Sequence, residues 1–166
     1  MVSRMSAADH LATYLNDHLG GAATGVEMSR RLAEETRHEP DGTDLARIAE
    51  AIEEDRETLR GLVEKLGASQ NPVKQAVGWV AEKAHRLGVS ETLTRNAALT
   101  RMLRAEILSL GIEGKRIMWV ALREVASAHP QLGEVDVDGL VERARQQRER
   151  VEAYRVAMAR RAFTGE

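Results

Sequence analysis

Long stretches without a helix breaker are the feature that most constrains the fold of this 166-residue chain. Only three prolines occur, and between them apolar residues recur every three or four positions, as on one face of a helix. The chain also has a low content of β-branched residues, which disfavours strands. These observations predict an all-α protein.

Capping residues, glycines and prolines define the expected ends of four long helices and one short helix. We place these helices at 6–37, 44–66, 72–87, 96–128 and 137–163. Asp41 or Thr43 can cap the second helix, and Asp136 can cap the last. The segment 67–95 connects two pairs of helices whose own links are short. The predicted architecture is a four-helix bundle of two antiparallel hairpins, with the short helix in the long crossover, in a single domain over residues 1–166.

Helical spacing predicts which side chains of each helix face the core. In the first helix these are Leu11, Leu15, Ala22, Val26, Ser29 and Leu32. In the second helix they are Leu45, Ile48, Ile52, Leu59, Leu62 and Leu66, and in the last helix Leu140, Ala144, Val151 and Met158. In the fourth helix they are Leu99, Leu103, Leu110, Ile117 and Val120. On the opposite side of the fourth helix we expect Arg101, Arg104, Lys115 and Arg123. A second apolar stripe, with Leu108, Ile112 and Trp119, is expected to lie outside, under the crossover helix (Val73, Val77, Trp79, Val80) or in a dimer interface.

Each long helix also places polar side chains on its predicted inner face. They are His18 in the first helix, Asp55 in the second, Glu106 and Glu113 in the fourth, and Gln147 and Tyr154 in the last. Counting from the helix ends at about 1.5 Å per residue puts all of them near mid-height. The small residues Gly20, Gly21, Ala22, Ala23 and Gly25 follow His18. Since a helical glycine costs about 1 kcal/mol relative to alanine, we expect these residues to admit a neighbouring helix or to leave room for a ligand or water.

A carboxylate on an inner face needs a compensating partner, and three solutions are open. The first is ion pairing with arginines that flank the inner faces, namely Arg56, Arg143, Arg150 and Arg161. The second is a metal site of iron, manganese or zinc with the ligands His18, Asp55, Glu106 and Glu113, supported by hydrogen bonds from Tyr154 and Gln147. The third is a protonated carboxylate, or a small polar ligand in a cleft.

The order hairpin, crossover, hairpin resembles that of the ferritin-like superfamily. The segments YLNDHLGGAATGVEMSRRL and LRAEILSLGIEGKRIMWVALREV are similar to an uncharacterised bacterial branch of it. Metal-binding members carry a glutamate on two helices and a Glu-x-x-His pair on each of the other two. Here a Glu-x-x-His pair occurs at Glu82 and His85, on the short crossover helix, and the second and last helices lack histidine. The resemblance therefore implies the fold without a standard di-iron centre.

Composition excludes several other classes. There are no cysteines, which removes disulfides and thiolate chemistry, and no Ser-His-Asp or Gly-x-Ser-x-Gly arrangement is visible. With 24 basic and 26 acidic residues the net charge is −2, which gives no general attraction to nucleic acid or membranes. The N-terminus lacks a signal-like apolar core, so a cytoplasmic protein is predicted.

These observations leave two functional hypotheses. One is a non-catalytic structural or stress-associated protein, a homodimer with a buried polar network. The other is a metal-dependent protein with a non-standard carboxylate and histidine site, acting in redox or metal handling. Whether the protein is an enzyme stays open.

Overall fold

A computed structural model describes residues 5–67, 95–133 and 135–165. It contains four α-helices, α1 (Ala7–Thr36), α2 (Gly42–Lys65), α5 (Ala97–Val125) and α6 (Val137–Thr164). Two 3₁₀ turns, η1 (Ala126–Ala128) and η2 (Pro130–Leu132), link α5 to α6. No strand occurs in the described residues, which confirms the all-α prediction. The predicted helix at 72–87 lies outside them.

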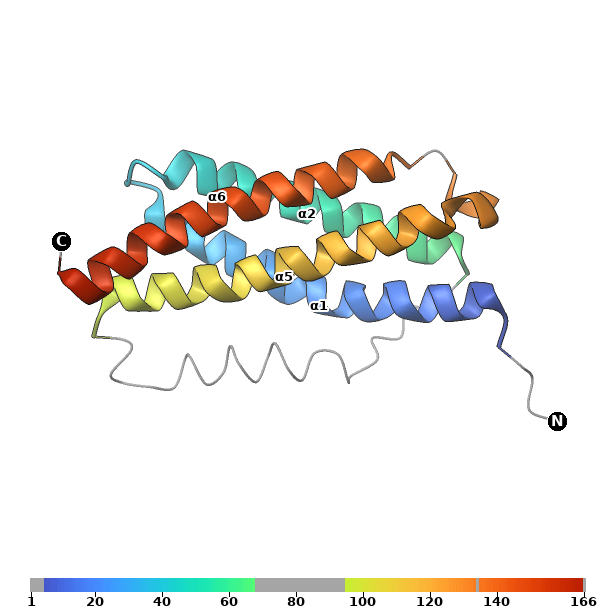
Figure 1. Cartoon of the computed structure of the whole chain (residues 1–166), viewed down its shortest axis with the longest axis horizontal. Helices are drawn as coiled ribbons and strands as arrows, with labels where there is room; N and C mark the ends of the chain where they lie inside the picture. Colours follow the sequence, from blue (N-terminus) through green and yellow to red (C-terminus); the bar gives the residue numbers. More distant parts are fainter. Residues whose placement is uncertain (1–4, 68–94, 134, 166) are drawn as a thin grey trace.

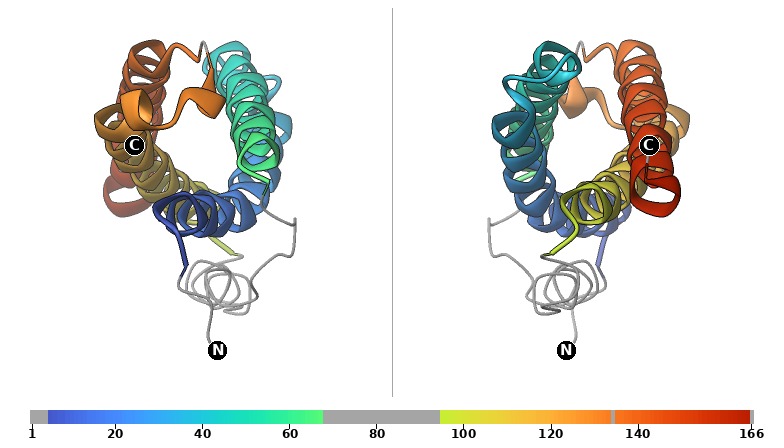
Figure 2. Two further views of the ribbon diagram at one scale, coloured as in Figure 1. Left: turned by 90° about the vertical axis from the view of Figure 1, so that its right-hand side faces the viewer. Right: turned by 90° about the vertical axis from the view of Figure 1, so that its left-hand side faces the viewer.

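The four helices lie along one axis as two antiparallel pairs, α1 with α2 and α5 with α6 (Figure 1). Viewed from its ends, the bundle arranges the helices around a common centre (Figure 2). The chain leaves α2 at one end of the bundle and enters α5 at the other (Figure 1). Ion pairs connect the two hairpins at one end of the bundle, where Arg101 and Arg104 near the start of α5 contact Glu39 and Glu35 near the end of α1. Arg161 near the end of α6 lies 3.8 Å from Glu39.

Local sequence explains where the helices begin. Ser6 and Asp9 form a reciprocal capping box at α1. Asn96 accepts a hydrogen bond from the backbone N–H of Leu99 at 3.0 Å, and Asp136 accepts one from Gly139 at 2.9 Å. Asp41 precedes α2, but its side chain makes no capping bond. The expected ends of the long helices agree with the observed ones to within a few residues.

The inner faces of α2 and α6 are the ones that the helical spacing predicts. Asp55 lies in the apolar seam of α2 and is 1% exposed. In α6 the buried side chains are Leu140, Ala144, Gln147, Val151, Tyr154 and Met158. The prediction for α1 also holds for its buried residues Leu15, Val26, Ser29 and Leu32.

The predicted inner face of α5 is wrong, because the helix is rotated about its axis. Leu110 and Ile117 are 46% and 52% exposed, whereas Trp119 is completely buried. The core face contains Met102, Ala105, Leu108, Ile112, Met118, Trp119 and Leu122. Two apolar stripes run along this helix, and the stripe expected outside is the one that packs in the core.

Candidate functional site

Asp55 is the one charged side chain in the buried core of the described residues. It occupies a position of α2 where the helical spacing of Ile52, Leu59 and Leu62 brings the side chain inward. Removing a carboxylate from water costs several kcal/mol unless hydrogen bonds and opposite charges replace the lost hydration. The surroundings of Asp55 supply both.

Three side chains from the second hairpin bind Asp55. Arg143 of α6 donates through Nη2 to Oδ1, and Lys115 of α5 donates through Nζ to Oδ2. Gln147 donates through Nε2 to Oδ2 at 3.1 Å, and its Oε1 accepts from Lys115 Nζ at 2.6 Å. Arg143 and Gln147 are four residues apart, so they project from one face of α6. We call Asp55, Lys115, Arg143 and Gln147 the Asp55 network.

The Asp55 network places two cations around one carboxylate. The Lys115 side chain is only 16% exposed, and this burial lowers its pKa below the ordinary value, an effect that Asp55 opposes by stabilising the ammonium. Arg143 also reaches Glu54 at 3.3 Å, on the surface of α2. Both oxygens of Asp55 are therefore engaged by protein donors. This arrangement corresponds to the first of the three solutions, ion pairing, with Arg143 as one of the expected arginines.

Glu106 and Glu113 do not join Asp55, because the rotation of α5 places them on the flank of the bundle. Glu113 receives two hydrogen bonds from Arg116, at 3.0 and 2.7 Å, which lower its pKa. Arg148 lies 3.6 Å from it. The Glu106 side chain is 42% exposed and lies 4.0 Å from Arg155. The expectation that Glu106 and Glu113 face the core is thus wrong.

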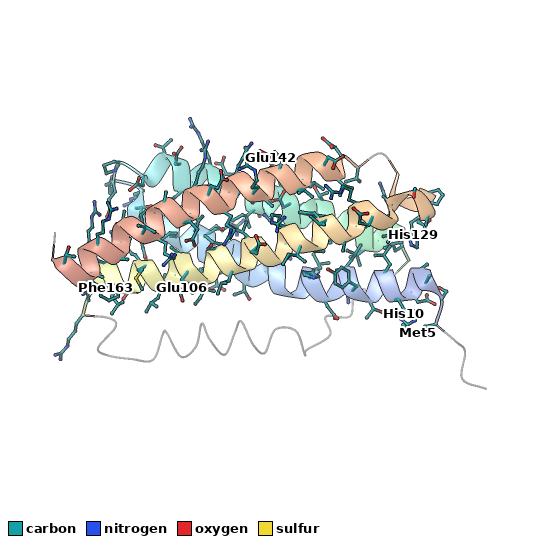
Figure 3. The ribbon with its side chains drawn as sticks, viewed as in Figure 1. Met5, His10, Glu106, His129, Glu142 and Phe163 are labelled. Atoms are coloured by element: carbon teal, nitrogen blue, oxygen red, sulfur yellow. The ribbon has the colours of Figure 1, made fainter. Side chains whose placement is uncertain are left out.

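His18 is half-buried on α1, where its ring packs edge-on against Tyr14 at a centroid distance of 4.8 Å. Burial lowers the pKa of His18. In the part of the chain that the structure describes, no three histidine or acidic side chains are grouped so as to hold a metal ion. His10 and His129 lie at the end of the bundle farthest from Glu106 (Figure 3). The four predicted ligands His18, Asp55, Glu106 and Glu113 are therefore not brought together.

Gln147 and Tyr154, the two residues expected to support the metal site by hydrogen bonds, do not lie together either. Gln147 is buried and belongs to the Asp55 network. Tyr154 is buried too, but its hydroxyl finds no hydrogen-bond partner among the described residues. Burial raises the pKa of Tyr154 to about 12. The charges that influence its pKa most are Arg101 and Glu39 near one end of the bundle, and Tyr154 takes no part in holding Asp55.

A cavity of about 340 Å³ lies beside the Asp55 network, between α1, α2 and α5. Asp55 and Lys115 are on its wall, together with His18. The wall also contains four helical glycines, Gly21, Gly25, Gly111 and Gly114. A Cβ atom built at any of these glycines meets no atom within 4 Å. The expectation that small residues near His18 leave room is therefore met by a cavity rather than by close helix packing.

Lys115 and Trp119 are the residues of this region that the sequence reasoning misplaced. Lys115 was expected on the outer face, but the rotation of α5 brings its apolar stem to the core boundary and its ammonium to Asp55. The spacing of Met102, Ala105, Ile112 and Trp119 is a signal that indicates the correct face. That stripe competes with the equally regular stripe of Leu103, Leu110 and Ile117.

The fold and the site define the class of this protein as an all-α four-helix bundle with a charged residue network in its core. Comparison with family models, with curated proteins and with solved structures gave no match. Among the described helices, none has an apolar stretch long enough to span a membrane.

Proposed function

We propose that this chain is a non-catalytic, ferritin-like bundle protein in the cytoplasm, with a structural or stress-associated role and no standard di-iron centre. The observation that carries the proposal is the state of Asp55, whose two oxygens are engaged by Arg143, Lys115 and Gln147. Protein donors occupy most of the roughly four acceptor positions of this carboxylate, and two of these donors are cations, which disfavours a metal ion at Asp55. The hairpin order of the described helices supports the ferritin-like assignment.

A structural role agrees with where the Asp55 network lies. Backbone packing is extensive within each hairpin and sparse between α2 and α6. The network bridges that sparse contact, since it joins Asp55 of α2 to Lys115 of α5 and to two residues of α6. Buried polar residues set the register between elements in some proteins. We propose the same task for the Asp55 network.

We further propose that the protein is a homodimer that associates through the outer stripe of α5. Leu110 and Ile117 are seven residues apart and about half exposed, so they form an apolar strip on one side of that helix. Exposed apolar strips with polar surroundings are typical of association surfaces. Arg116, beside Ile117, supplies polar surroundings of this kind.

The alternative of a metal-handling protein is tested by elemental analysis. The protein is purified after growth with added iron, manganese and zinc, in wild-type form and as Glu106→Ala. We expect less than stoichiometric metal in both, because Glu106 and Asp55 do not share a site. Stoichiometric metal that disappears in the Glu106→Ala protein would overturn the non-catalytic proposal and support the metal-dependent one.

A further inference from the structure

The cavity between α1, α2 and α5 is large enough for an organic molecule. Its volume of about 340 Å³ lies at the lower end of the range of ligand pockets. An engineered cavity of about 150 Å³ with an apolar lining already binds benzene. Most of the wall is apolar, with Ile52, Leu59, Ile112 and Met118 among its residues. Such a wall accommodates an aromatic ring or a short chain.

No close contact within the bundle requires the glycines of the cavity wall to lack a side chain. Gly21 and Gly25 of α1 and Gly111 and Gly114 of α5 each cost about 1 kcal/mol relative to alanine in a helix. A Cβ atom at any of them meets no neighbouring atom. Four such positions around a single cavity keep its volume free. Glycine also permits the backbone to approach a bound molecule closely.

Polar atoms without partners are concentrated on residues of the same wall. Five buried side-chain polar atoms lack a hydrogen-bond partner among the described residues, and three of them belong to cavity residues. These three are Asp17 Oδ1, Arg56 Nε and Trp119 Nε1. Buried polar atoms are almost always satisfied in native proteins, so each one requires an explanation. A bound molecule with a polar group is such an explanation.

The charges on the cavity wall indicate which kind of polar group a bound molecule would carry. Asp17 and Asp55 are acidic, and Arg56 and Lys115 are basic, so the formal charges of the wall cancel. The unpartnered atoms include donors, on Arg56 and Trp119, and an acceptor, on Asp17. We propose that this cavity is a binding site for a small uncharged molecule with an apolar ring or chain and one hydroxyl or amide group. This inference goes beyond the structural role proposed above and does not depend on it.

The test uses three probes of similar shape, 2-naphthol, 2-methylnaphthalene and 2-naphthoate, with the 166-residue chain labelled at its isoleucine methyl groups. Three of the five isoleucines, Ile52, Ile107 and Ile112, line the cavity, whereas Ile48 and Ile117 do not. We expect 2-naphthol to shift the methyl resonances of the first three in a saturable way and to leave the other two unchanged. Shifts of all five, or of none, overturn the proposal.

Calorimetry with the same probes tests the polar part of the proposal. A hydrogen bond contributes about 1 kcal/mol net, so 2-naphthol should bind roughly three- to tenfold more tightly than 2-methylnaphthalene. It should also bind more tightly than the anionic 2-naphthoate, because the wall has no excess of positive charge. Equal affinities for 2-naphthol and 2-methylnaphthalene, or tighter binding of 2-naphthoate, overturn the assignment of an uncharged polar ligand.

Two glycine variants form a matched pair. Gly25→Leu places a side chain in the cavity, whereas Gly61→Leu places one on α2 away from it, and a Cβ atom meets no neighbour at either position. We expect Gly25→Leu to abolish the binding of 2-naphthol and Gly61→Leu to retain the wild-type affinity. Retained binding in Gly25→Leu would show that the probe binds elsewhere and would overturn the proposal. If Gly25→Leu fails to fold, the isoleucine methyl shifts of the wild-type protein still test whether 2-naphthol binds in the cavity.

Discussion

Asp55 is a buried carboxylate with two cations beside it, so its contribution to stability depends on its charge more than on its shape. We expect Asp55→Asn to lower the free energy of unfolding by about 3 kcal/mol, because it leaves Lys115 without a counter-charge in a poorly hydrated position and removes one of the two carboxylates that pair with Arg143. Urea denaturation measures the loss. Glu54→Gln is the control, since Glu54 pairs with the same arginine from a side chain that is 69% exposed. A loss of equal size in the two variants would contradict the role given to Asp55.

His18 gives the stability a dependence on pH whose sign follows from the direction of its pKa shift. Burial lowers the pKa of His18 below 6.5, so just below pH 6.5 the unfolded chain binds more protons than the folded one. The free energy of unfolding therefore falls as the pH decreases through that window.

We expect His18→Gln to lose less stability than the wild type between pH 7.5 and pH 5.5. The measurement is urea denaturation at both pH values, with the other four histidines common to the two proteins. If the free energy of unfolding changed by the same amount between the two pH values in wild type and in His18→Gln, the proposed effect of burial on the pKa of His18 would be refuted.

Three residues of the Asp55 network show what the sequence can predict about this site and what it cannot. Asp55 and Gln147 were predicted on inner faces because each occupies a slot in an otherwise apolar seam, and both are buried. Lys115 was not predicted, since a long side chain can carry its charge inward from the edge of a helix face. Periodicity locates the Cβ atom of such a residue and leaves the position of its charged end undetermined.

At the scale of elements, the turn between α1 and α2 depends on a close approach of backbones at Gly42. A Cβ atom there would lie 2.3 Å from the carbonyl oxygen of Thr36. We expect Gly42→Ala to destabilise the protein by about 1 to 3 kcal/mol, because the contact is with backbone that cannot move aside cheaply.

The matched change Gly61→Ala should have the opposite sign. Gly61 is inside α2, where a Cβ atom meets no neighbour, so alanine should stabilise the protein by about 1 kcal/mol through its helix propensity. Thermal or urea denaturation of both variants checks the pair. Two changes of the same sign would refute the account of the turn.

The helices differ in how well their buried faces could be predicted. In α2 and α6 one apolar seam faces a largely polar opposite side, so the spacing identifies the core. In α5 apolar residues form two stripes, and spacing alone does not say which one packs against the other helices. The choice of the wrong stripe moved Glu106 and Glu113 into the predicted core and Trp119 out of it. One rotation of α5 accounts for all of these errors.

At the scale of the whole molecule, the proposed homodimer makes the outer stripe of α5 an association surface. We expect Ile117→Glu to shift the protein from dimer to monomer in sedimentation equilibrium, because it places a charge in the centre of an apolar contact. Val156→Glu is the control, since Val156 is a similarly exposed apolar residue on α6. A wild-type protein that sediments as a monomer at all concentrations would refute the proposed dimer.

The position of the Asp55 network also bears on how the molecule assembles in time. Asp55 and Arg143 are 88 residues apart in the chain, and they meet only when the two hairpins dock. Contacts within a hairpin close short loops and form early, whereas a contact of this separation is expected after the rate-limiting step. Weakening it would then accelerate unfolding and leave the refolding rate nearly unchanged. Asp55 would thus set the lifetime of the native state rather than the speed with which it is reached.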